Sequence, residues 1–241
     1  MHLAVSNDLF EIHVEDRIPS WKLASPKWPT LQLDPLTCEI QINGNTYCPG
    51  EVHAEMTHNE DRLELIWVFP KLQVRLIQTL SLGPGGSLNL LSKFENPSKA
   101  GLTLNRVALV KLEKPKQPVF GSAQEKVRIY EEGGYWGRVR PLNRPINQVS
   151  KRAEQTPGTE IAGTSQTCWV IHNQTDHMAL LVGYTTFDRW LGTISIRYDP
   201  TSGVKEWAVG FDGGDLLIDP GQTVQLEEVV FLIGQDPWHL L

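Results

Sequence analysis

One segment combines aromatic rings, glycines and guanidinium groups, IYEEGGYWGRVRPLNRP (129–145). Tyr135 or Trp136 could stack on the face of a sugar ring while Arg138 donates paired hydrogen bonds to hydroxyl groups. The alternative, which we favour, is that Trp136 fills the end of a sheet and Arg138 pairs with an acid. If the chain has a ligand surface, we expect it at Tyr135, Trp136 and Arg138.

Glu131 and Glu132 in this segment form the most site-like acidic pair. Glycoside hydrolysis needs two carboxylates roughly 5 to 10 Å apart across a sugar. Adjacent residues of a strand point to opposite faces, so we interpret this pair as surface charges of a loop.

A second candidate segment is YTTFDRWLG (184–192). We interpret Asp188 as capping a turn, with Phe187 and Trp190 packed beneath it. A ligand role for Asp188, Arg189 or Trp190, most simply in carbohydrate binding, is the alternative.

Histidines and cysteines suggest no catalytic centre. His172 and His177 bracket NQTD, which predicts a hairpin turn, and no histidine has a recognisable nucleophile partner. The Asn43-Gly44 turn signal places Cys48 opposite Glu39 and Cys38 on the other face, so we do not expect a disulfide between the two cysteines. Metal-ligand spacings are absent, and we expect no metal or other cofactor.

Composition excludes two kinds of partner. The net charge is -6 without a basic cluster, which argues against nucleic acid. The longest apolar runs, LELIWVF and MALLVGY, are shorter than the roughly 20 residues that span a bilayer. The first residues show no signal-peptide pattern, so we expect a cytoplasmic protein.

Period-two hydrophobicity dominates the chain. RLELIWVF places Leu63, Leu65, Trp67 and Phe69 on one face, and LQVRLIQTL repeats the pattern after a turn at Pro70-Lys71. Further strand-like runs follow, separated by the turn signals ENPS, DPTSG, DGGD and DPGQ. These runs are LNLLSKF, LTLNRVALVKL, KVRIYEE, TCWVIHN, HMALLVGYTT, GTISIRYD, EWAVGF and TVQLEEVVFLI.

This pattern predicts an all-β protein built from two large, stacked antiparallel sheets. Only NQVSKRAEQ (147–155) could form a short helix. No linker or repeat divides the chain, so we expect residues 1–234 to form one β-sandwich domain.

The last residues, GQDPWHLL, predict the start of a helix, with Asp236 as N-cap and Pro237 at the first helical position. A single turn does not offset the cost of its own nucleation. We therefore expect Trp238, Leu240 and Leu241 to contact apolar surface, either on this domain or on another. We interpret residues 235–241 as the start of a linker helix to a missing C-terminal domain, and the chain as truncated.

Two segments resemble a known family. LIDPGQTVQLEEVVFLIGQDPWHLL (217–241) and SLNLLSKFENPSKAGLTLNRVALVKL (87–112) resemble the N-terminal β-supersandwich of α-galactosidase-like glycoside hydrolases, family 36 and its relatives in clan D. In that family, a PG turn precedes the last strand, and a helical linker leads to a catalytic (β/α) barrel. The resemblance implies a galactose-mutarotase-like supersandwich in a protein of carbohydrate metabolism.

The family's catalytic aspartates lie in the barrel, one of them in a Lys-x-Asp context that does not occur in this sequence. The resemblance therefore implies a non-catalytic accessory domain whose partner is the barrel, with carbohydrate and homo-oligomer contacts as further possibilities. Aldose 1-epimerases share the fold and are complete enzymes of somewhat greater length, but their Asn-His-x-Tyr-Phe-Asn-Leu-like segment is missing here. A free-standing carbohydrate-binding module is the other alternative.

Overall fold

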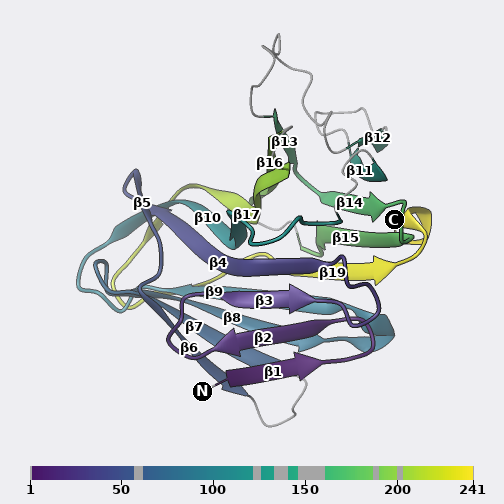
Figure 1. Ribbon diagram of the computed structural model, residues 1–241. Coiled ribbons are helices and arrows are strands. Elements are labelled where there is room, and N and C mark those ends of the chain that lie inside the picture. The colour runs from purple at the N-terminus through teal and green to yellow at the C-terminus, as the bar shows by residue number, and fades with distance from the viewer. Residues whose placement is uncertain are drawn as a thin grey trace.

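The computed structural model describes residues 2–56, 62–121, 126–132, 141–145, 161–186, 190–199 and 203–240. Their strands form two antiparallel sheets (Figure 1). Sheet I has nine strands in the described part of the chain, in the order β1 (His2–Ser6), β2 (Glu11–Glu15), β3 (Trp21–Ala24), β4 (Gln32–Ile42), β10 (Leu102–Glu113), β17 (Gly203–Ile218), β16 (Leu191–Asp199) and β13 (Ile161–Ser165), with β5 (Asn45–Tyr47) paired to β4.

Sheet II has ten strands among the same residues. Their order is β12 (Pro141–Pro145), β11 (Val127–Glu132), β14 (Cys168–Asn173), β15 (Met178–Tyr184), β19 (Val229–Gly234), β9 (Leu88–Glu95), β8 (Val74–Leu82), β7 (Arg62–Phe69) and β6 (Glu51–Met56), with β18 (Thr223–Gln225) paired to β9. Two short 3₁₀ helices, η1 (Pro84–Gly86) and η4 (Pro237–His239), complete the elements named here. The predicted all-β sandwich is confirmed.

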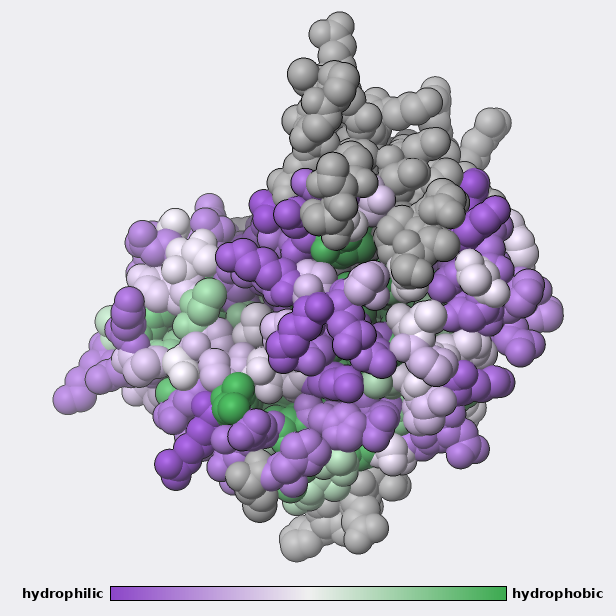
Figure 2. Space-filling model, in the orientation of Figure 1, coloured by the Kyte–Doolittle hydropathy of each residue, from purple (hydrophilic) through white to green (hydrophobic). Residues whose placement is uncertain are grey.

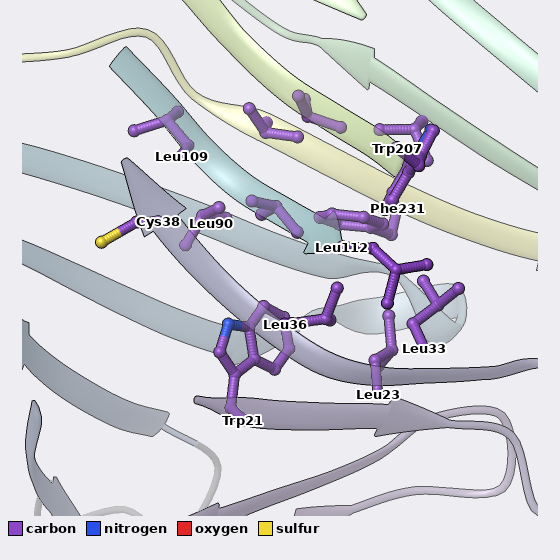
Figure 3. Packing of buried hydrophobic residues seen from close by; sticks show 14 of the residues in the cluster. Trp21, Leu23, Leu33, Leu36, Cys38, Leu90, Leu109, Leu112, Trp207 and Phe231 are labelled. Carbon is purple, nitrogen blue, oxygen red and sulfur yellow. The ribbon is translucent and has the colours of Figure 1, made fainter. Parts of the chain in front are cut away.

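The two sheets bury their facing sides in one continuous core. Leu63, Leu65, Trp67 and Phe69 are at most 1% exposed, as their alternation predicts. Figure 3 shows residues of β3 and β4 in sheet I packed toward Leu90 and Phe231 of sheet II. Hydrophilic side chains cover most of the face seen in Figure 2. No helix in the described part of the chain has the length and hydropathy of a membrane span.

One polar side chain, Gln78, lies in the centre of this core. Its oxygen accepts a hydrogen bond of 2.7 Å from Trp67 Nε1, and its nitrogen donates one of 2.8 Å to the Leu109 carbonyl of sheet I. The register of β10 skips Leu109 against both β4 and β17, so this residue lies in a bulge. Gln78 thus donates across the core to the carbonyl of a bulged residue, where the ladder of sheet I is irregular.

Asn96 joins two turns that are distant in sequence. It is fully buried, and its side-chain nitrogen lies 2.9 to 3.2 Å from the carbonyl oxygens of Ala100, Ile218 and Asp219. The main chain adds a bond of 2.7 Å from Gly221 N–H to the Asn96 carbonyl. The predicted ENPS and DPGQ turns are therefore held together by one residue.

One predicted turn was wrong. DGGD (212–215) lies inside the paired strand β17, where Leu104 faces Leu216 and Arg106 faces Asp212. Gly214 and Asp215 have φ angles of 56° and 59°, which make a bulge within the strand rather than a reversal. The expected helix at 147–155 lies outside the described residues.

Candidate functional site

The first predicted ligand surface cannot be placed. Tyr135, Trp136 and Arg138 lie outside the described residues, as does Asp188 of the second candidate segment. Glu131 and Glu132 are the last two residues of strand β11, so their expected position in a loop was wrong. These ligand roles remain predictions.

Of the candidate ligand residues in the second segment, Trp190 lies in the described part of the chain, whereas Arg189 does not. Its indole ring stacks on Phe211 of β17, with centroids 5.5 Å apart and an interplanar angle of 29°. The side chain is nevertheless only half-buried. Its backbone N–H donates a hydrogen bond of 3.3 Å to Glu227 Oε1. The ring is thus both packed and partly exposed, while the predicted turn capped by Asp188 lies outside the described residues.

Glu227 is a site residue that the sequence analysis missed. It is 4% exposed and lies in a break between β18 and β19, which was predicted as one strand, TVQLEEVVFLI. A signal was present in the apolar pattern: the buried apolar positions are Val224 in β18 and Leu226 at the start of the break, but Val229 and Phe231 in β19. This change from even to odd positions requires an irregular residue in between, because side chains alternate strictly along a regular strand.

Tyr184 stands beside this break and connects the sheets. Its hydroxyl contacts the carbonyl oxygens of Gly210 and Thr193 and accepts a 3.2 Å bond from Thr193 N–H. Burial raises the pKa of the Tyr184 hydroxyl well above its ordinary value, so the group stays protonated. Arg106 and Glu227 both act on this hydroxyl electrostatically, with opposite signs.

The C-terminal segment packs on the outer face of its own sheet II. Asp236 accepts a 2.9 Å hydrogen bond from Trp238 N–H, which confirms the predicted N-cap, and Pro237 is buried. Trp238 lies edge-on to Tyr130 at 5.3 Å and is 56% exposed. Leu240 packs against a small outer cluster, formed by Tyr130, Val170, Ala179 and Leu181. The apolar surface that these side chains contact is thus on this domain, while Leu241 lies outside the described residues.

His172 borders this outer cluster. Its ring lies 6.3 Å from that of Tyr130, and neither ring nitrogen has a hydrogen-bond partner among the residues that the structure describes. Burial lowers the pKa of His172, and His177 adds to this, while Asp236 and Asp176 act in the opposite direction. The neutral imidazole is therefore the favoured form.

Metal and disulfide chemistry find no support in the described residues. They contain no group of three or more histidine, cysteine or acidic residues suited to a metal ion. Cys38 and Cys48 do not form a disulfide with each other. Ile40 pairs with Tyr47 in the β4–β5 hairpin. This is the register that was used to predict that Cys38 and Cys48 lie on separate faces.

No family model matches the chain, and no curated protein matches it. The structure is similar to a family GH36 α-galactosidase, AgaA from Geobacillus stearothermophilus, with a TM-score of 0.64 and 12% identity over 98% of this chain and 41% of that one. An α-galactosidase from Lactobacillus brevis gives 0.60 and 12%, over 97% of this chain and 39% of its own. The likeness shows a shared fold. The chain spans about two fifths of the length of these α-galactosidases.

A third neighbour is a putative aldose 1-epimerase from Escherichia coli K12. Its TM-score is 0.58 with 12% identity, and the match covers 98% of this chain and 99% of that one. The match therefore extends along nearly the whole of both chains. The galactose-mutarotase-like supersandwich is confirmed as the fold.

Proposed function

We propose that the chain is the non-catalytic β-sandwich domain of an α-galactosidase-like glycoside hydrolase. In this proposal, residues 1–234 form the sandwich, residues 235–241 lead toward a C-terminal catalytic (β/α) barrel, and the protein is cytoplasmic. The observation that carries it is the coverage: 98% of this chain matches the fold of AgaA, but only 41% of AgaA is matched. This coverage is expected if the chain corresponds to one domain of a larger enzyme such as AgaA.

The C-terminal segment suggests where the barrel would contact the sandwich. Trp238 is 56% exposed although it is one of the largest apolar side chains, and it lies beside the outer cluster that Leu240 covers. Exposed apolar surface of this kind tends to mark contacts with other protein surface. Trp238 and Leu240 are therefore the proposed interdomain residues, together with Leu241.

The reading frame of the gene beyond Leu241 tests this directly. A following (β/α) barrel with an aspartate in a Lys-x-Asp context is the expected result. A stop codon after Leu241 would overturn the proposal. As a biochemical check, the 241-residue chain should not hydrolyse 4-nitrophenyl α-galactoside above the buffer rate, whereas a chain extended through the barrel should.

An aldose 1-epimerase is the second candidate, favoured by the match over 99% of the E. coli protein. Mutarotation needs a base at the anomeric hydroxyl and an acid at the ring oxygen, both within reach of the sugar. Glu227 is the buried carboxylate among the described residues, and its 4% exposure and bond to a backbone N–H suit a structural role better than proton exchange with a sugar. Polarimetry with fresh α-galactose decides: mutarotation faster than in buffer would favour the epimerase.

A further inference from the structure

The break between β18 and β19 is hydrogen-bonded to the segment that connects β15 of sheet II to β16 of sheet I. Thr185 N–H donates to the Glu228 carbonyl at 3.1 Å, and Glu228 N–H donates to Thr186 Oγ1 at 2.9 Å. Trp190 N–H donates to the Glu227 carboxylate at 3.3 Å. One break in sheet II therefore holds both the beginning and the end of the connection that leads to β16 of sheet I.

The choice of a glutamate at position 227 is unexpected on stability grounds alone. Burial removes a carboxylate from water, and this is favourable only when the protein supplies hydrogen bonds and opposite charge. The carboxylate accepts the Trp190 N–H, and Arg106 is the cation that acts on the neighbouring Tyr184 hydroxyl. An apolar residue would fill the same space without this desolvation, but it could not accept the Trp190 N–H, so a hydrogen-bond acceptor at position 227 is better explained by what it fixes.

What Glu227 fixes is a supported aromatic ring. Phe211 stacks against the Trp190 indole, whose side chain is still half-buried rather than buried. A ring that is backed by a second ring and held through its own backbone N–H is a rigid surface. Rigid, partly exposed indoles stack well on the apolar C–H faces of pyranose rings, whose hydroxyl groups remain in water.

We propose that Glu227 is a positioning residue that fixes Trp190 as a saccharide-stacking surface at this end of the sandwich. The ligand class, a pyranose saccharide, rests on the proposed carbohydrate-related function. Glu227 itself does not contact the saccharide, because it is 4% exposed. Its role is to accept the Trp190 N–H, and a neutral acceptor of the same length fulfils that role as well.

The test uses the indole N–H resonance of Trp190 in the ¹⁵N-labelled chain, assigned through Trp190→Phe. Glu227→Gln keeps the acceptor. The chemical shift of this resonance, and the accessibility of the Trp190 indole to the quencher acrylamide, should therefore stay close to wild type. Glu227→Ala should shift the resonance and make the Trp190 indole more accessible to acrylamide. Glu228→Ala is the matched control, since Glu228 bonds through its backbone and should behave as wild type. An unchanged Trp190 resonance in Glu227→Ala would overturn the positioning role.

Titration with raffinose tests the saccharide. We expect a dissociation constant on the order of 1 mM, with the Trp190 resonance among those that move. Trp190→Ala and Glu227→Ala should each weaken binding by about tenfold, the value of one stacked ring, and Glu227→Gln should rescue it. If Glu227→Ala does not fold, the folded Trp190→Ala variant still decides the location.

Two results would overturn the saccharide surface. One is raffinose binding that moves other resonances but leaves Trp190 unchanged. The other is no saturable change with raffinose or galactose at concentrations about a hundred times the expected dissociation constant. Neither result affects the proposed domain role, which depends on the reading frame beyond Leu241 and on hydrolysis by the extended chain.

Discussion

The side chain of Gln78 donates a hydrogen bond of 2.8 Å to the Leu109 carbonyl and so joins the two sheets through the centre of the core. Gln78→Leu removes this bond and the one that Gln78 accepts from Trp67, leaving two buried polar groups unpaired. We expect the free energy of unfolding to fall by about 2 to 4 kcal/mol, measured in urea. Thr79→Ala, on the opposite face of β8, should change it by less than about 0.5 kcal/mol. Equal effects of the two variants would contradict this interpretation.

Leu240 packs the C-terminal segment onto the outer cluster, so this segment should contribute to stability. Leu240→Ala removes apolar contact area from a half-buried position, and we expect a loss of about 1 kcal/mol. The control is His239→Ala, because the His239 side chain is 87% exposed. If both variants unfold at the same urea concentration as wild type, the segment is not part of the folded unit.

His172 should make the protein less stable in mild acid. Its folded-state pKa is lowered from the ordinary value of 6.5, chiefly by burial, so folding favours the neutral form. This contribution is complete above the unfolded pKa and is lost as the pH falls through the lower folded pKa. Between about pH 7.5 and pH 5, wild type should therefore lose more stability than His172→Gln, which has no proton to bind. His239→Gln should follow wild type, and the same pH dependence in His172→Gln would assign the loss to other groups.

Gly210 on β17 lies too close to β10 to carry a side chain. A Cβ atom there would be 1.9 Å from the Val107 carbonyl oxygen and 2.8 Å from Ala108 Cα, both backbone atoms that cannot rotate away. Gly210→Ala should cost more than about 3 kcal/mol or prevent folding. In Gly101→Ala the nearest atoms would be 3.9 Å away, and thermal melting should stay close to wild type. A Gly210→Ala variant that melts with wild type would show that the strands can separate at little cost.

Much of the fold follows from local pattern. Alternating apolar residues predicted β7 and β8, because a strand with one buried side must repeat every second residue, and strand-like runs between turn signals predicted β14 to β16. The Asn43-Gly44 turn and the Asp236 cap were found from residue type, since both depend on local backbone geometry. Strand order could not be predicted from the sequence. β10 lies between β4 and β17, and no local signal specifies partners so far apart in sequence.

The candidate site was harder to predict. Glu227 was not singled out within the run TVQLEEVVFLI, because glutamate is rarely buried, and its burial depends on the break that its neighbours create. DGGD looked like a turn because the same positive φ angles serve a reversal and a bulge, and only the pairing with β10 separates the two. Trp190 was named from its residue type, but its support by Phe211 comes from another strand.

The contacts of Asn96 can form only late in folding during synthesis. Its amide nitrogen bonds the Ile218 carbonyl, 122 residues later in the sequence, and β10 needs β17 as a neighbour. When only the first half of the chain has left the ribosome, its strands therefore have unpaired edges, and the Asn96 amide lacks the Ile218 acceptor. Such non-local closure slows folding and leaves sheet edges open to other chains meanwhile. During synthesis, the protein should depend on chaperone binding until the last strands emerge.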